Sequence, residues 1–290
     1  MKSAPFSYVR PESLADALGV LESSAGGARV LAGGQSLVPM LQMRLMQVDT
    51  LIDINRLPGL DDVRADGPET VFGPLVRHTM LESLPLVSER LPLLQSAIRY
   101  VGDPQIRNRG TIGGSLAQAD PTGEIPLACL ALDAVVVAQS VSGSRRIAIG
   151  DLLVGSYATA LEPEEMITEV RVPPAAHHFA FLERNRKHND FAVINVAIVG
   201  CRDSDGRWSS LRIALGGVND RPVLAVEAAS LLEGTMLEEE AVAEAAQLAL
   251  EVVDPPSDIR ASAEYRRHLV PIYVRRALTK LRDDHERPDV

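Results

Sequence analysis

The chain has 290 residues, of which 46% are hydrophobic and 23% are charged, and its net charge is −10. This length allows two or three folded units with cores of their own, and the composition is ordinary for a globular protein. The negative charge argues against nucleic acid as a partner, because contacts to phosphate groups require clustered Lys and Arg.

The two cysteines, Cys129 and Cys201, lie in apolar or strand-like surroundings without a second thiol at metal-ligand spacing. The chain therefore cannot supply the thiolates of an iron–sulfur cluster or a zinc site, and we expect two buried, reduced thiols. The N-terminal segment lacks the apolar stretch of a signal peptide, and no apolar run approaches the roughly 18 residues of a membrane helix. We expect a cytoplasmic protein that is not an integral membrane protein.

The first part of the chain alternates between helix and strand patterns. "SLADALGVLESS" places its apolar residues on one helical face, and Ser13 with Asp16 is typical of a helix start. "ARVLA" and "TLIDI" have the composition of strands. "SLVPMLQMRLM" predicts a helix, with Ser36 as its N-cap and Pro39 in its first turn. Residues 1–56 are thus expected to form a small α/β unit.

Residues 57–175 are expected to form a second α/β unit. Strand-like runs occur in "DDVRADGPETVFGPLV", Thr79 and Glu82 have capping-box spacing, and "LPLLQSAIRYV" is an amphipathic helix. "GTIGGSLAQADPTGEIP" has the composition of a polar loop. A helix then runs into a strand at 134–138, and "EEMITEVRVP" is another strand. His78 precedes the capping box, so we expect it at the surface or in a capping role.

Residues 176–290 predict a C-terminal α+β domain. "PPAAHH" resembles a linker, and we do not interpret His177 and His178 as metal ligands. Two long apolar strands follow, joined by a hairpin at Asp205–Gly206, and then two helices. The basic residues of "EYRRH" and "VRRAL" indicate a solvated helix face, with contact to a partner subunit as the alternative. The whole chain is expected to be α+β.

Two glycine-rich stretches, "AGGQSL" at 32–37 and "IGGSLA" at 112–117, echo each other. Paired glycines permit positive φ, and they let a ligand approach the main chain, whose N–H groups attract anions. Two such loops could hold a pyrophosphate, although a paired-glycine turn is more often only a turn. The chain lacks a GxGxxG after a strand and a GxxxxGK[ST] motif, so an ordinary dinucleotide fold and a P-loop are both excluded.

Five ordered motifs are more specific: "RVLAGGQSLVPML", "DPQIRNRGTIGGSLAQADPTGEIP", "NDFAVINVAIV", "ALGGV" and "SAEYRRHLVPIYVRRAL". Together they closely resemble the FAD-binding medium subunit of the molybdenum hydroxylases, over essentially the whole chain. This family includes flavoprotein subunits of carbon monoxide dehydrogenase and of N-heterocycle hydroxylases, and the flavin domain of xanthine dehydrogenase. The resemblance implies FAD between two N-terminal subdomains, followed by an antiparallel sheet with helices.

The resemblance also implies an FAD-binding set. The first loop would wrap the pyrophosphate with its main chain, and the second would close on it. Glu124, or nearby Asp120, would contact the sugar part, Ile167 would lie along the flavin, and Phe191 would cover the isoalloxazine ring. The loop positions are Val30, Leu31, Ala32, Gly33, Gly34, Gln35, Ser36 and Leu37, and Thr111, Gly113, Gly114 and Ser115.

The sequence departs from the family pattern at two positions. Phe191 stands where some relatives have Tyr, so a hydroxyl is missing there. Glu183 stands where relatives often have Lys, which removes a positive charge near the flavin. Lys187 could replace that charge, or it could be an ordinary solvated cation of the loop.

The resemblance implies an electron-transfer subunit of a heterotrimer, arranged as a dimer of heterotrimers. A large subunit with a molybdenum–pterin cofactor would hydroxylate a small substrate, for which N-heterocyclic compounds are one class in the family, and a small subunit with two [2Fe-2S] clusters would relay electrons. No residue of this chain would then act as acid, base or nucleophile on that substrate. The complex could also associate with the inner face of the membrane. Two alternatives are a stand-alone flavin oxidoreductase and an assembly protein without FAD.

Overall fold

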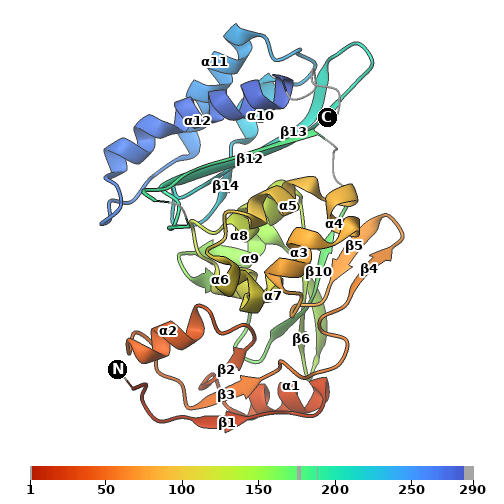
Figure 1. Ribbon diagram of the computed structural model, residues 1–290, viewed down its shortest axis with the longest axis vertical. Helices are drawn as coiled ribbons and strands as arrows, with labels where there is room; N and C mark the ends of the chain where they lie inside the picture. Colours follow the sequence, from red (N-terminus) through yellow and green to blue (C-terminus); the bar gives the residue numbers. More distant parts are fainter. Residues whose placement is uncertain (1, 175–177, 188, 284–290) are drawn as a thin grey trace.

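The computed structural model describes residues 2–174, 178–187 and 189–283. Within these residues the strands form sheets of three, five, four and two strands. Figure 1 shows three stacked layers of structure, with the N-terminal unit at one end, a helix-rich middle unit, and the C-terminal sheet with its helices at the other end.

The N-terminal unit is a parallel sheet in the order β1-β3-β2, flanked by two helices. The expected cap at its start is confirmed, since the Ser13 hydroxyl accepts the N–H of Asp16 at 3.1 Å. The core of this unit, including Ala17 and Ile52, also contacts Leu75 and Met166 of the middle unit. The elements are β1 (Ser7–Val9), α1 (Leu14–Ser23), β2 (Ala28–Leu31), α2 (Leu37–Gln42) and β3 (Thr50–Asp53).

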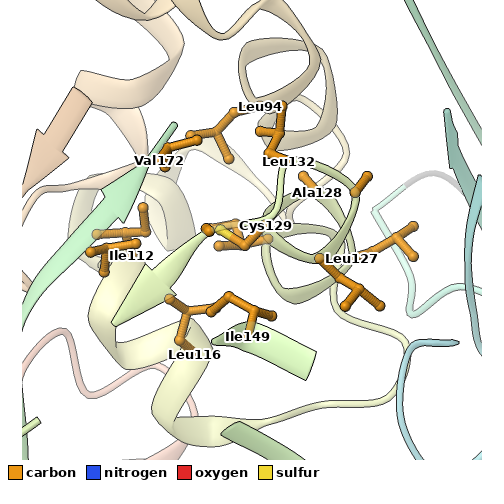
Figure 2. Packing of buried hydrophobic residues seen from close by; sticks show 14 of the residues in the cluster. Leu94, Ile112, Leu116, Leu127, Ala128, Cys129, Leu132, Ile149 and Val172 are labelled. Carbon is orange, nitrogen blue, oxygen red and sulfur yellow. The ribbon is translucent and has the colours of Figure 1, made fainter. Parts of the chain in front are cut away.

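The middle unit is an antiparallel five-stranded sheet in the order β4-β5-β10-β6-β7, covered by short helices. Its helix α8 is apolar on nearly every side and buried, as expected for a helix packed on all faces. Figure 2 shows Cys129 of α8 among Ile112, Leu116 and Ile149. The elements are β4 (Val63–Asp66), β5 (Glu69–Phe72), α3 (His78–Ser83), α4 (Pro85–Arg90), α5 (Pro92–Ile98), α6 (Pro104–Arg109), α7 (Ile112–Gln118), α8 (Glu124–Ala131), β6 (Val135–Ser140), β7 (Gly143–Ala148), α9 (Ile149–Leu152), the paired β8 (Leu153–Gly155) and β9 (Ala158–Thr159), and β10 (Met166–Val172).

The C-terminal unit is an antiparallel sheet, β11-β12-β13-β14, with helices on one side. The expected hairpin at Asp205–Gly206 joins β12 to β13. On β13, Arg212 donates to the carbonyls of Leu130 and Ala131 at the end of α8, which ties this sheet to the middle unit. The elements are β11 (His178–Arg184), β12 (Ile194–Arg202), β13 (Trp208–Gly216), β14 (Val223–Leu224), α10 (Val226–Leu231), α11 (Glu239–Leu248), the 3₁₀ turn η1 (Ala249–Val252) and α12 (Ala263–Asp283).

Three local expectations are wrong, and one strand was not predicted. The segment expected to be a polar loop contains α7, and Gly113 and Gly114 lie in its first turn rather than before a helix. The Thr79–Glu82 capping box does not form, because α3 begins two residues earlier than that box requires, after Arg77. The Ser36 side chain makes no capping hydrogen bond, since its backbone is already close to helical. Strand β11, which the sequence analysis did not predict, pairs with β12.

The burial of two side chains, Cys201 and Arg266, differs from what the sequence predicted. Cys129 is buried as expected, but Cys201 is exposed, because a bulge between Val199 and Cys201 shifts the register of β12. Arg266 of "EYRRH" is fully buried rather than solvated, and donates to the carbonyls of Val193 and Gly217 at 2.6 and 2.8 Å. None of the helices in the described ranges is long and apolar enough to cross a bilayer.

Candidate cofactor site

The two glycine loops lie against each other. We call residues 31–36 loop 1 and residues 109–115 loop 2. A Cβ on Gly33 would stand only 2.2 Å from the carbonyl oxygen of Arg109, so glycine is required where the loops touch. The two glycine-rich stretches with similar sequences therefore lie at one place in the structure.

Asn55 and Arg77 brace this contact, and the sequence analysis did not single out either one. The Asn55 amide donates to the carbonyls of Leu31 and Ala32 at 3.2 and 2.8 Å. Its oxygen accepts Arg77 at 2.7 Å, and Arg77 also donates to the Arg109 carbonyl of loop 2. Partial burial, and next the charge of Arg109, hold the pKa of Arg77 below its ordinary value. Asn55 lies two residues after the end of β3. Ligand sites commonly form at the carboxyl ends of parallel strands, so its position was the available signal.

Loop 1 lines a cavity of about 360 Å³. Within the described part of the chain, the main-chain N–H groups of Gly34, Gln35 and Ser36 donate to no other group. Gly34 has a φ of +74°, which turns the main chain here, and the Gln35 side chain folds back onto the Gly33 carbonyl at 3.1 Å. Free donors beside a cavity suit an anion. The lining is Leu31, Ala32, Gly33, Gly34, Gln35, Val38, Pro39, Asp53, Asn55 and Arg109.

The N–H groups of Ile112, Gly113 and Gly114 in loop 2 already have acceptors within the protein. The amides of Ile112 and Gly113 donate to the carbonyls of Val76 and Pro74, and the amide of Gly114 donates to the Thr111 hydroxyl at 3.1 Å. The two glycines differ in surroundings. A Cβ on Gly113 would lie 2.5 Å from the Pro74 side chain, whereas a Cβ on Gly114 would meet only the Thr111 hydroxyl. Gly113 is therefore required for packing, and Gly114 leaves open space beside the loop.

His78 lies behind loop 2 and is buried, so the expected surface or capping role is wrong. Its Nε2 is 3.1 Å from the Ser115 hydroxyl. Burial lowers the pKa of His78 to about 4. At neutral pH the ring is uncharged and holds the Ser115 side chain in place.

The segment after α7 forms the second part of the site. Asp120 accepts the N–H and the hydroxyl of Thr122, both at 2.8 Å, and the Tyr157 hydroxyl lies 3.4 Å from its other oxygen. Two hydrogen bonds attach this segment to the C-terminal unit: Gly217 N–H to the Pro121 carbonyl, and the Asn195 amide to the Thr122 carbonyl, each at 2.9 Å. The glycine pair at the end of β13 is therefore structural.

The remaining predicted positions differ in how far their side chains are exposed. Phe191 is 51% exposed, and the guanidinium of Arg260 lies 4.5 Å from the centre of its ring. Lys187 is exposed. Ile167 is buried in β10 within the core of the middle unit. An aromatic ring left this open is available to a ligand.

Two acidic side chains lie between the middle and C-terminal units. Glu124 is the first residue of α8, and burial together with the charge of Asp120 raises its pKa. Glu183 lies on β11, and burial together with the charge of Glu124 raises its pKa. No cluster of three or more potential metal-binding side chains occurs among the described residues.

Two known families match the chain. Residues 4–175 match the FAD binding domain in molybdopterin dehydrogenase, and residues 179–281 match the CO dehydrogenase flavoprotein C-terminal domain. These matches span nearly the whole chain, so the protein belongs to the FAD-binding subunits of the molybdenum hydroxylase family, an oxidoreductase family. The sequence-based resemblance and the α+β fold are confirmed.

Individual relatives are similar over their full lengths. The alpha subunit of the 6-hydroxypseudooxynicotine dehydrogenase complex of Paenarthrobacter nicotinovorans is 40% identical, covering 97% of this chain and 95% of the relative. Reconstituted CO dehydrogenase from Oligotropha carboxidovorans superposes with a TM-score of 0.95 at 34% identity, covering 98% and 99% of the two chains. Quinoline 2-oxidoreductase from Pseudomonas putida 86 gives a TM-score of 0.93 at 34% identity, with the same coverage.

Proposed function

We propose that FAD lies along the two glycine loops and extends toward Phe191. The observation that carries this proposal is the set of unpaired amides at Gly34, Gln35 and Ser36, which line a cavity together with Arg109. Main-chain donors and a guanidinium suit the two negative charges of a pyrophosphate. Loop 2 would contribute the hydroxyls of Thr111 and Ser115, since its amides are already engaged.

The residues of this chain would bind and orient the cofactor. Residues Val30 to Leu37, which include loop 1, would hold the pyrophosphate, and Asp120 or Glu124 would hold the sugar part. Phe191 would cover the ring and exclude water, Ile167 would line its surroundings, and Lys187 would add a charge from the solvent side. FAD supplies the redox chemistry by accepting and passing on two electrons. The division into subdomains 1–56 and 57–175 and a domain 176–290 belongs to this proposal.

The chain would act as the electron-transfer subunit of a heterotrimer. The relatives named above are parts of dehydrogenases and oxidoreductases, and one is named as a subunit of a complex. A molybdenum–pterin large subunit and a small subunit with two [2Fe-2S] clusters would be its partners, in a dimer of heterotrimers. Relatives named for a nicotine derivative and for quinoline favour a small N-heterocyclic substrate on the large subunit.

Native co-purification tests this function. The chain should bring down two partner chains, and reduction of the partner's substrate site should reduce the flavin. Substrate oxidation by the chain alone, without partners, would favour the stand-alone flavin enzyme instead. A protein that neither contains nor binds flavin would favour the assembly protein.

A further inference from the structure

An exposed aromatic ring of the C-terminal unit is held on one face by a cation. Phe191 is 51% exposed, and the guanidinium carbon of Arg260 lies over its ring, 4.5 Å from the centre. A cation over an aromatic face is attracted by the ring, more strongly where the cation is partly removed from water. Only 27% of the Arg260 side chain is exposed, so this contact orients the ring while half of Phe191 stays open.

The turn that carries Arg260 is itself fixed by hydrogen bonds. One oxygen of the Asp258 carboxylate accepts the N–H of Arg260 at 2.8 Å, and the other accepts the guanidinium of Arg266 at 2.8 Å. Arg266 is buried, and it also donates to the carbonyl of Val193 at 2.6 Å, two residues after Phe191. The segment that carries the cation and the segment that carries the ring are therefore held by the same buried guanidinium.

Asp190 adds a further contact between these two segments. Its Oδ1 lies 3.5 Å from the Nε of Arg260, and the same oxygen accepts the N–H of Phe191 at 2.9 Å. Between the same segments, Arg186 donates to the carbonyl of Ile259 at 3.0 Å. Asp190 thus fixes both the guanidinium and the main chain of the ring, and its negative charge partly compensates the charge of Arg260.

The Arg260 side of this pair faces the segment that follows α7. Burial raises the pKa of Tyr157, the charge of Asp120 raises it further, and the charge of Arg260 lowers it. The Tyr157 hydroxyl lies 3.4 Å from the Asp120 carboxylate, and charges act in water mainly within about 10 Å. The pair of Phe191 and Arg260 therefore faces Asp120, one of the two residues proposed to hold the sugar part of FAD.

We propose that Arg260 is a positioning residue of the cofactor site, which holds Phe191 against the isoalloxazine ring and supplies a fixed positive charge behind it. This inference rests on the proposed function, because it requires FAD on the open face of Phe191. The ring of Phe191 would then be enclosed between the guanidinium and the cofactor. Arg260 is better placed for this role than Lys187, because Lys187 is exposed and Arg260 is held by Asp190 and by the ring.

FAD affinity tests the positioning. Arg260→Met keeps a long side chain and removes the planar cation, so the affinity of flavin-free protein for FAD should fall about twofold to fivefold, the size of a cation–π contact. In a Phe191→Ala background the same change should have no effect, because no ring is left to hold. Arg276→Met is the matched control, since Arg276 lies 5.6 Å from the centre of the Tyr273 ring on α12 and should keep wild-type affinity. No loss, or an equal loss in both backgrounds, would overturn the positioning role.

The midpoint potential of the bound flavin tests the charge. Arg260→Met should shift the potential to more negative values, because a lost positive charge disfavours the addition of electrons. Asp190→Asn should shift it to more positive values, because it removes the compensating charge while its amide oxygen can still accept the Phe191 N–H. Arg260→Lys keeps the charge and should restore the potential toward that of the wild type. No shift, or shifts of the same sign in Arg260→Met and Asp190→Asn, would overturn the charge role.

Unfolding of the flavin-free protein tests the contact without the cofactor. In urea denaturation, the losses of stability in Arg260→Met and Phe191→Ala should not add in the double variant, because both remove the same contact. Additive losses would show that the two side chains do not hold each other. Wild-type protein that binds no FAD would contradict the proposed function and, with it, the role of Arg260. Wild-type affinity and potential in an Arg260→Met protein that binds FAD would contradict the role of Arg260 alone.

Discussion

Replacing Gly114 by alanine separates cofactor binding from folding. The new Cβ would stand 2.7 Å from the Thr111 hydroxyl, so it displaces that hydroxyl from its cap on the Gly114 amide. Loss of an N-cap costs about 1 kcal/mol. Alanine in a helix gains about 0.5–1 kcal/mol over glycine. The two effects nearly cancel, so the free energy of unfolding should change by less than about 1 kcal/mol.

The effect on FAD should be larger than the effect on folding. A methyl group at position 114 fills the open space beside loop 2 through which the cofactor would approach the main chain. We expect FAD affinity to fall about tenfold or more, equivalent to about 1.4 kcal/mol of binding free energy. The bulkier substitution Gly114→Val at the same site should abolish binding, because its branched side chain fills more of that space.

The assay combines urea denaturation with titration of flavin-free protein by FAD. Gly19→Ala is a matched control, because Gly19 lies in α1 and a Cβ there would meet no atom within 4 Å. That control should keep wild-type affinity and gain slight stability. Wild-type FAD affinity in a folded Gly114→Ala protein would refute the placement of the cofactor on loop 2.

Three further predictions follow from the same contacts. Asn55→Ala removes both hydrogen bonds to loop 1 and leaves Arg77 without its side-chain acceptor. The free energy of unfolding should therefore fall by about 2 kcal/mol, and FAD affinity should fall with it. Unchanged FAD affinity by titration would show that Asn55 does not support loop 1. The pKa of His78 is lowered to about 4, so the unfolded chain takes up its proton first, and stability should be greatest above about pH 6.5 and decline by about 3 kcal/mol toward pH 4. Denaturation of His78→Gln across this range should lose that part of the slope, and an identical slope would contradict it. Phe191→Ala should weaken FAD binding or shift the flavin potential while changing stability by less than about 1 kcal/mol, because the ring is half exposed; unchanged affinity and potential would exclude Phe191 from the site.

The sequence patterns predicted the elements whose signal is local. Helix α1 begins at its Ser13 cap, and the β12–β13 hairpin turns at its Asp-Gly pair. Helix α7 was missed because paired glycines disfavour a helix, and packing of Gly113 against Pro74 overrides that preference. Strand β11 was missed because its pairing with β12 is tertiary, and its polar end at Glu183 resembles a loop.

The site was predictable in part. The two glycine loops could be predicted because their sequences are similar. The family resemblance supplied the positions that follow them in the chain. The brace of Asn55 and Arg77 could not be read from spacing, because it joins residues 22 positions apart through side-chain contacts. The buried state of His78 and the contact between Phe191 and Arg260 likewise depend on how distant segments of the chain meet, which no local pattern records.

The flavin content of the natively purified protein tests the central claim most directly. We expect an absorbance band near ~450 nm, as for flavins bound as redox cofactors, corresponding to one FAD per chain. Colourless protein that binds no FAD on titration would contradict the account.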